Sequence, residues 1–407
     1  MQSNSIARRG FYLAAAAVSM LFAGIIYAWS ILKAPLAAEF GWNPQQLTLN
    51  FTLTMCFFCI GGLVTGLALK KISLRTILIL SGIMVGLGFF LSSRCTQNGL
   101  VQLYLSYGVL CGCGIGMAYN GILSAANAWF PDKKGTSSGV QMMAFGASSL
   151  ILGNLSSSLI ANPDFGWRKT FLLLGLGTGI VLILAAFVLR FPPADTVFPK
   201  GKSPAAQKEQ EDFEPRDYTT GEMIRRFPFW RFFLFSVTMA AVGNTVISSA
   251  RDMALSVGAS VGLATLMVGV LAICNGLGRL LSGALFDAVG RRRTMLIGNL
   301  ITILAPAALL VATLLSSVPL IIAGLCLAGL SYGFSPPISS AFILSFYGQK
   351  NFSMNFSIAN TMLIPTSFVA TLGGSIVSST GSYVGVYVLL LVFSVISLLL
   401  DLSIKRP

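Results

Sequence analysis

The stretch NGLGRLLSGALFDAVGRRR (Asn275–Arg293) places one arginine inside a long apolar segment that ends in a glycine turn with three more arginines. Between Val261 and Phe286, Arg279 is the only charged residue. If this segment is a membrane helix that ends near Asp287, Arg279 lies about 12 Å deep in a hydrocarbon core of about 30 Å. Such an arginine costs at least about 2.5 kcal/mol, so it needs a counter-charge, a water cavity or both.

The composition of the 407-residue chain is that of a polytopic membrane protein. It is 55% hydrophobic and 10% charged, whereas a soluble domain has roughly 25% charged residues. The net charge of +14 does not indicate nucleic-acid binding, because that function requires a basic face on a soluble domain. We therefore expect a lipid bilayer as the surroundings and no nucleic-acid partner.

Twelve apolar runs are long enough to cross a membrane, which predicts an all-α membrane protein. They lie at about 10–34, 47–69, 76–92, 102–128, 136–160, 170–189, 230–250, 262–286, 295–314, 318–345, 353–378 and 383–400. We expect three parts: an N-terminal six-helix bundle (1–190), a cytoplasmic linker (191–227) and a C-terminal six-helix bundle (228–407). Near the end of the linker, Thr219–Glu222 has the pattern of a capping box that begins a short helix.

Lysines and arginines in the loops predict the orientation. With the N-terminus inside, 21 of the 27 lie on the cytoplasmic side, five lie outside and Arg279 is in the membrane. This bias predicts that both termini are cytoplasmic, in an inner membrane, and we expect a monomer.

An internal repeat appears when residues are compared at an offset of 217. Gly66 aligns with Gly283, and WFPDKK (Trp129–Lys134) aligns with FYGQKN (Phe346–Asn351). The same offset holds from the second to the fifth span and from the eighth to the eleventh. Duplicated halves of this kind are typical of secondary transporters, which bind substrate near the midplane.

These features resemble a known family over essentially the whole chain. The twelve spans and the turn GALFDAVGRRR (Gly283–Arg293) resemble the major facilitator superfamily. Within it, YAWSILKAPL (Tyr27–Leu36), WFPDKKG (Trp129–Gly135), NGLGR (Asn275–Arg279) and FYGQKN (Phe346–Asn351) resemble the oxalate/formate antiporter family and related monocarboxylate transporters. The resemblance implies two pseudo-symmetric halves and transport of small organic anions by alternating access.

The resemblance also implies a role for Arg279, because relatives have an arginine at this place in span eight that binds the substrate carboxylate. The alternative is a structural arginine paired with an acid of the protein. The 13 acidic residues favour the first reading, since none lies in the middle of a predicted span. Glu39, Asp132, Asp252, Asp287 and Asp401 lie at span ends, Asp164 lies in a loop, and the other seven lie in the linker region.

Two departures from the resembled families bear on coupling and substrate charge. Monocarboxylate transporters carry an aspartate one helical turn before the arginine, where this chain has Asn275, and the chain has no histidine. Asparagine can donate and accept hydrogen bonds but cannot titrate, so we expect exchange or facilitated flux instead of proton symport.

Oxalate carriers have a lysine fifteen residues after the glycine of the aromatic-Gly turn; from Gly348 that position is Leu363. One arginine balances one negative charge, which favours a short monocarboxylate such as pyruvate, lactate or formate. Oxalate/formate antiport and proton-coupled symport remain the alternatives.

Four polar or aromatic residues of other spans are candidates to line the same site. Asn120 lies near the midplane of span four and matches an asparagine of the monocarboxylate transporters. Tyr332 occupies a span-ten position that is an aromatic cavity residue in the oxalate carriers. Tyr27 and Tyr119 can donate hydrogen bonds through their hydroxyl groups. For each of these residues, packing between helices is an alternative role.

Two basic turns are candidates for a cytoplasmic gate, and several glycines for close helix contacts. The turn in the first half, GLALKKISLR (Gly66–Arg75), lacks the usual acidic residue of the superfamily. The predicted gate residues are Lys70, Lys71, Arg75, Asp287, Arg291 and Arg292. The glycines expected to permit close approach of helices are Gly112, Gly114, Gly116, Gly276 and Gly278.

Other function classes fit the sequence less well. An enzyme would need catalytic groups, but the chain has no histidine, no phosphate-binding GxxxxGK[ST] and no intramembrane acid pair. We expect no cofactor and no metal. A sugar or drug facilitator gives little reason for a lone buried arginine, and a membrane sensor would need a large soluble output domain.

Overall fold

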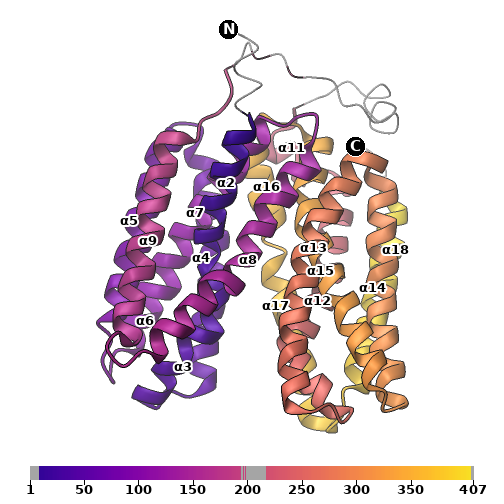
Figure 1. The fold of residues 1–407 in the computed structure, drawn as a ribbon. Coiled ribbons are helices and arrows are strands. Elements are labelled where there is room, and N and C mark those ends of the chain that lie inside the picture. The colour runs from indigo at the N-terminus through magenta and orange to yellow at the C-terminus, as the bar shows by residue number, and fades with distance from the viewer. Residues whose placement is uncertain (1–8, 194–195, 197, 199–216, 405–407) are drawn as a thin grey trace. The chain divides into compact units, whose positions relative to one another are not determined.

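The structure is a computed structural model that describes residues 9–193, 196, 198 and 217–404. Most of the predicted linker lies outside the described residues. Every regular element within them is a helix (Figure 1). The order is α2 (Arg9–Ala23), η1 (Gly24–Ala28), α3 (Trp29–Phe40), α4 (Pro44–Ala68), α5 (Leu74–Ser93), α6 (Leu100–Leu103), η2 (Tyr104–Cys111), α7 (Gly112–Ala128), α8 (Lys134–Ala161), α9 (Gly166–Val188), α11 (Thr220–Ile224), α12 (Phe227–Ser256), α13 (Val261–Val289), α14 (Arg291–Leu314), α15 (Val318–Tyr347), α16 (Phe352–Asn360), α17 (Leu363–Thr380) and α18 (Val384–Ser403).

The predicted spans are confirmed. In the described part of the chain, twelve helical segments are long and apolar enough to cross a membrane. Most are longer than the apolar runs that predict them; the seventh, for example, extends over Phe227–Ser256. The predicted capping box is also present, because the Thr219 hydroxyl accepts from the Glu222 amide while the Glu222 carboxylate accepts from the Thr219 amide.

Three spans are interrupted, which the hydropathy pattern does not predict. The first contains the 3₁₀ segment η1, and the fourth contains the π-helical segment η2. The eleventh is broken by a turn at Thr361–Met362 between α16 and α17. Pro365 explains this break, since a proline cannot donate to the carbonyl four residues earlier and its ring displaces that carbonyl, here that of Thr361.

The described chain forms two compact units. Unit 1 takes the described residues of Met1–Pro131, Ala144–Pro199 and Phe352–Ile358, and unit 2 takes those of Asp132–Met143, Lys200–Asn351 and Ala359–Pro407. The first part of α8 therefore belongs to unit 2, and most of α16 belongs to unit 1. The domain limits expected from the sequence, at 190 and 228, remain a prediction.

Glycines bring helices into close contact inside each unit. In unit 1, a Cβ at Gly116 would clash with the Phe58 carbonyl. In unit 2, a Cβ at Gly278 would lie 2.5 Å from the Leu330 carbonyl oxygen, so α13 and α15 pack backbone against backbone. The expectation for Gly276 is wrong, because the nearest atom to a Cβ there is Cγ of Met143 at 3.9 Å. The neighbour of Gly276 is therefore a side chain of α8, at ordinary contact distance.

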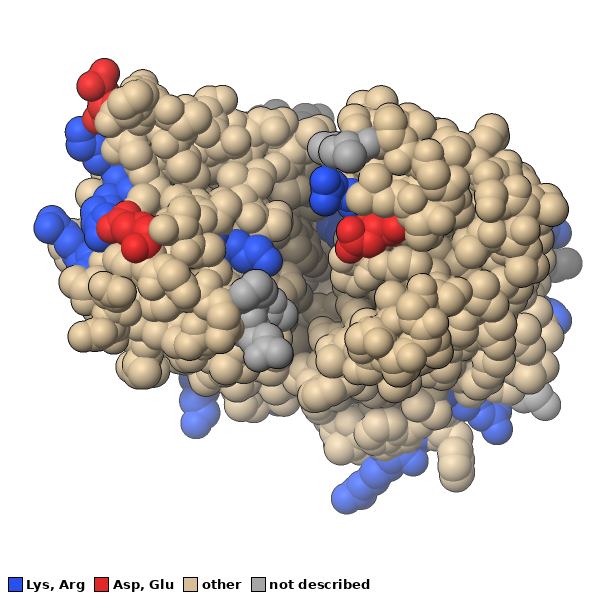
Figure 2. Space-filling view, turned by 90° about the horizontal axis from the view of Figure 1, so that it is seen from below, with Lys and Arg blue, Asp and Glu red and all other residues tan. Residues whose placement is uncertain are grey.

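The outer surface of the helices is apolar. Large side chains such as Leu176 and Leu184 on α9 are about 60% exposed (62% and 59%), as expected for helices that contact lipid. The face drawn in Figure 2 is mostly uncharged, with small groups of basic and acidic residues. Within unit 1, the exposed side chains of Arg168 and Glu39 form a salt bridge at 2.7 Å.

Candidate functional site

Arg279 is the centre of the candidate site. Its side chain is 3% exposed and lies on α13, which continues to Val289. The residue is therefore ten positions from the helix end, about 15 Å at the usual rise. Its Nη1 donates to the Met142 carbonyl oxygen at 2.6 Å, and its Nε donates to Oδ1 of Asn275 at 3.3 Å.

Both described partners of Arg279 are neutral oxygens. A guanidinium carries five N–H donors, and these two contacts leave three of them, including both on Nη2. A buried cation that is held only by dipoles keeps most of its charge uncompensated. The arrangement can therefore receive an anion, and a carboxylate fits best because it accepts two parallel hydrogen bonds from one guanidinium.

Two other helices pack closely against α13 around Asn275 and Arg279. Asn275 lies one helical turn before Arg279, so both side chains share a face of α13. On the α15 side, a Cβ at Gly333 would clash with the Asn275 carbonyl. On the α8 side, a Cβ at Gly139 would lie 2.7 Å from the Arg279 carbonyl oxygen. These glycines let α15 and α8 approach α13 closely at the level of the arginine.

Tyr332 and Leu363 also lie in unit 2. Tyr332 is half-buried on α15, and the absence of a side chain at Gly243 on α12 makes room for it, since a Cβ there would clash with the tyrosine. Leu363 is the half-buried first residue of α17, directly after the break in span eleven. Its side chain offers no charge at the position where the resembled oxalate carriers have a cation.

In unit 1, Asn120 is tightly engaged. It is 1% exposed, and its Nδ2 lies 2.8 Å from the Gly62 carbonyl oxygen, 2.9 Å from the Ser353 carbonyl oxygen and 2.5 Å from Ser357 Oγ. The hydroxyl of Ser124 donates to its Oδ1 at 3.4 Å. These contacts join α7 to α4 and α16, so the amide nitrogen of Asn120 is occupied by protein groups.

Tyr27 and Tyr119 meet around Phe145 of α8. The Phe145 ring centre lies 5.3 Å from that of Tyr27 and 4.9 Å from that of Tyr119. Phe58 completes the cluster, 5.2 Å from Tyr119. The sequence analysis did not single out Phe58 or Phe145, because a phenylalanine in an apolar run carries no signal of its own.

The predicted site residues thus form two groups. Tyr27, Tyr119 and Asn120 gather in unit 1 with the phenylalanines. Asn275 and Arg279 contact each other in unit 2, where Tyr332 and Leu363 also lie.

Asp287, a predicted gate residue, caps the start of α8. Its Oδ1 accepts from the Gly135 amide at 2.8 Å, and its Oδ2 accepts from the Thr136 amide at 2.6 Å. Unpaired amides at a helix N-terminus carry partial positive charge, so a carboxylate there is stabilised. Asp287 therefore ties the end of α13 to the beginning of α8, with both groups inside unit 2.

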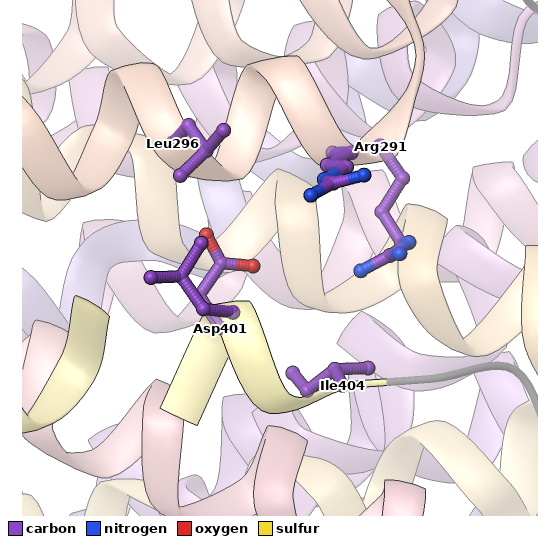
Figure 3. A pocket seen from close by; sticks show the side chains of 6 residues that line it. Arg291, Leu296, Asp401 and Ile404 are labelled. Carbon is purple, nitrogen blue, oxygen red and sulfur yellow. The ribbon is translucent and has the colours of Figure 1, made fainter. Parts of the chain in front are cut away.

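Arg291 faces the interior of unit 2. Its side chain is 9% exposed, and its guanidinium carbon lies 5.2 Å from the ring centre of Phe346. Figure 3 shows Arg291 and Asp401 among the side chains that line one pocket. The volume of this pocket is about 190 Å³. Its lining consists of Arg291, Arg292, Leu296, Asp401, Leu402 and Ile404.

Asp401 is more deeply buried than its place near a predicted span end indicates. It is 4% exposed in the last turn of α18, where it accepts from Nδ2 of Asn299 at 3.0 Å. Ser397 in turn donates to Oδ1 of Asn299 at 2.8 Å. This polar chain joins α18 to α14.

The remaining predicted gate residues are exposed. They are Lys70, Lys71 and Arg75 of unit 1 and Arg292 of unit 2. The Arg75 guanidinium carbon lies 4.1 Å from the ring centre of Phe187, a cation–π contact that connects the start of α5 with α9.

Comparison with known proteins places these features in a family. A sequence profile described as Major Facilitator Superfamily matches residues 12–250 and 232–406. YhjX of Escherichia coli, an MFS-type transporter, is 29% identical over 357 residues, which cover 88% of this chain and 85% of YhjX. The oxalate:formate antiporter of Oxalobacter formigenes is 28% identical over 382 residues, 92% of this chain and 87% of the relative. Monocarboxylate transporter 12 of Rattus norvegicus is 25% identical over 364 residues, 83% of this chain and 72% of the relative.

A solved structure agrees with the profile on the fold. The E. coli fucose:proton symporter FucP superposes with a TM-score of 0.70 at 13% identity, over 97% of this chain and 98% of its own. At that identity the likeness concerns the fold alone. Together with the profile match and the twelve spans, it shows that this chain belongs to the Major Facilitator Superfamily and is a multi-pass membrane transporter, not an enzyme.

Proposed function

We propose that the protein transports short monocarboxylates such as pyruvate, lactate or formate by alternating access, through exchange or facilitated flux. The observation that carries the proposal is the buried guanidinium of Arg279, whose described partners are a backbone carbonyl and an asparagine oxygen. An anion from solution supplies the charge that none of these described partners carries.

The names of two relatives support this substrate class. One is called an oxalate:formate antiporter and the other a monocarboxylate transporter. Both names refer to small carboxylates, which are the anions that the guanidinium best accommodates. The names leave open whether the substrate carries one charge or two.

Leu363 favours a single charge. A dianion at Arg279 brings a second carboxylate that needs its own compensation in a low-dielectric site, and leucine offers none. Asn275 argues against proton symport, because its side chain, one helical turn before the arginine, cannot take up and release a proton. We therefore assign monocarboxylate exchange or facilitated flux ahead of oxalate exchange and ahead of proton symport.

The rest of the transport scheme is proposed from the sequence pattern. Two six-helix bundles, 1–190 and 228–407, alternate in access, with both termini in the cytoplasm of a cell with an inner membrane. The gate consists of the basic turns that contain Lys70, Lys71 and Arg75 in the first half and Asp287, Arg291 and Arg292 in the second. The transporter acts as a monomer.

Counterflow in proteoliposomes tests the proposal. Vesicles loaded with unlabelled pyruvate should accumulate labelled pyruvate, and Arg279→Lys should reduce this at least about tenfold, since an ammonium cannot replace a bidentate guanidinium. Arg94→Lys, at an exposed arginine, is the matched control and should transport normally. Equal transport by the wild type and Arg279→Lys would contradict the proposed site.

Leu363→Lys tests the substrate charge in the same assay. The added cation should allow oxalate exchange that the wild type lacks. Wild-type oxalate transport that outpaces pyruvate and lactate would instead establish the oxalate/formate alternative.

A further inference from the structure

The contact between Arg279 and Met142 joins the binding residue to another helix. The 2.6 Å bond from Nη1 ends on a backbone carbonyl of α8, whereas the second bond, to Asn275, stays within α13. The guanidinium is therefore held at two points, and only one of them connects α13 to α8.

The first part of α8 is attached to unit 2 by a short series of polar contacts. Asp287 holds the amides of Gly135 and Thr136, and Ser138 Oγ lies 2.8 Å from Ser340 Oγ. The Met142 carbonyl is the last of the series. Directly after it, between Met143 and Ala144, α8 passes from unit 2 to unit 1.

We propose that the Met142 carbonyl is a placeholder for the substrate carboxylate. When substrate binds, a carboxylate oxygen takes the Nη1 donor, the bond to Met142 breaks, and the first part of α8 is held less firmly to α13. This inference rests on the proposed function, because it takes the ligand of Arg279 to be a carboxylate. It adds how binding at Arg279 reaches a second helix.

Replacing the Met142 carbonyl by a carboxylate oxygen leaves no hydrogen-bonding group without a partner. Both bonds have a charged donor, but a carboxylate also carries the opposite charge and can accept a second, parallel hydrogen bond from the guanidinium, so it is the better acceptor for Nη1. A helical carbonyl has two lone pairs and keeps its backbone partner four residues on, so Met142 is not left unsatisfied. Asn275 retains its bond to Nε and acts as a positioning residue that keeps the guanidinium pointing at the ligand.

Hydrogen–deuterium exchange of the full chain in nanodiscs tests the inference, with pyruvate as the probe. In the wild type, pyruvate should increase exchange in residues 134–143. Arg279→Gln should show increased exchange in this segment without ligand and no further response to pyruvate. Arg94→Gln, which removes an exposed arginine, should behave as the wild type.

Two results would overturn it. If ligand-free Arg279→Gln exchanges as the wild type does, the guanidinium does not hold α8. If pyruvate raises the thermal stability of the wild type but leaves exchange in 134–143 unchanged or lower, the carboxylate binds without displacing Met142.

A separate result bears on the proposed function. If pyruvate does not stabilise the wild type, the proposed function fails, while the ligand-free comparison still decides whether Arg279 anchors α8. Arg279→Lys gives a second variant if the glutamine form does not fold.

Discussion

At the scale of single residues, the candidate site centres on Arg279, whose partners among the described residues are two neutral oxygens. The lone charge within a long apolar run made Arg279 recognisable from the sequence. Its contact with Met142 was not predictable, since any residue offers a backbone carbonyl. The aromatic cluster of Tyr27, Tyr119 and Phe145 was predictable only in part. A tyrosine hydroxyl is a hydrogen-bond donor within an apolar span, whereas a phenylalanine there does not differ from its apolar neighbours.

Asn275→Asp provides a test at this scale. An aspartate one turn from Arg279 would pair with the guanidinium and compete with the substrate, because oppositely charged side chains four residues apart in a helix attract. We expect the KM for pyruvate to rise by about tenfold or more, which corresponds to about 1.4 kcal/mol. Asn275→Ala removes the hydrogen bond without adding charge and should have a smaller effect. An Asn275→Asp protein with wild-type KM would contradict the assignment.

At the scale of helices, the positions of the spans could be predicted and their interruptions could not. Hydropathy located all twelve, since length and apolar composition are what a membrane crossing requires. The only sequence marker of the break in span eleven is Pro365, a single proline within an apolar run. The π-helical segment Tyr104–Cys111 has no comparable marker.

Glycine contacts between α8 and α13 give the second prediction. A Cβ at Gly283 would clash with the Gly135 carbonyl, whereas a Cβ at Gly276 would lie 3.9 Å from its nearest neighbour. We expect Gly283→Ala to lose about 1–3 kcal/mol of stability through overpacking, and Gly276→Ala to lose little. Thermal unfolding of both variants in detergent decides this, and equal melting temperatures would show that the contact is not tight.

Asp287 gives a third prediction, for the attachment of α8. In Asp287→Asn, one oxygen and one NH₂ group replace two acceptor oxygens, so the Gly135 and Thr136 amides cannot both keep a side-chain acceptor, and the favourable charge at the helix start is lost. We expect the conformational population to shift toward the inward-facing state. Single-cysteine probes on the inner and outer sides should label faster and slower, respectively, than in the parent protein.

The matched control for this gate experiment is Asp252→Asn, at an exposed acid on α12. It should leave both labelling rates unchanged. Unchanged rates in Asp287→Asn as well would remove Asp287 from the gate.

At the scale of the whole molecule, the twelve spans and the turn Gly283–Arg293 gave the family resemblance. The profile match confirms the family, and the FucP structure agrees on the fold. The sequence did not indicate that part of α8 would join unit 2 and most of α16 would join unit 1. The unit to which each part of these helices belongs depends on contacts between segments that are distant in the sequence, and a hydropathy pattern contains no information about such contacts.

Proton coupling is also a property of the whole transporter. With Asn275 beside the arginine and no histidine in the chain, pyruvate exchange should not carry protons through the protein. A pH electrode should therefore record no rapid external alkalinisation when pyruvate is added to proteoliposomes without internal anion. Rapid alkalinisation that Arg279→Lys abolishes would support proton symport instead.

The most direct test of the central claim is calorimetric titration of the purified protein with pyruvate and with pyruvamide, which keeps the size and keto group of pyruvate but lacks its charge. If Arg279 is completed by a carboxylate from solution, pyruvate binds to the wild type, pyruvamide does not, and Arg279→Lys binds neither measurably. Equal binding of the two compounds, or undiminished pyruvate binding by Arg279→Lys, would contradict the claim.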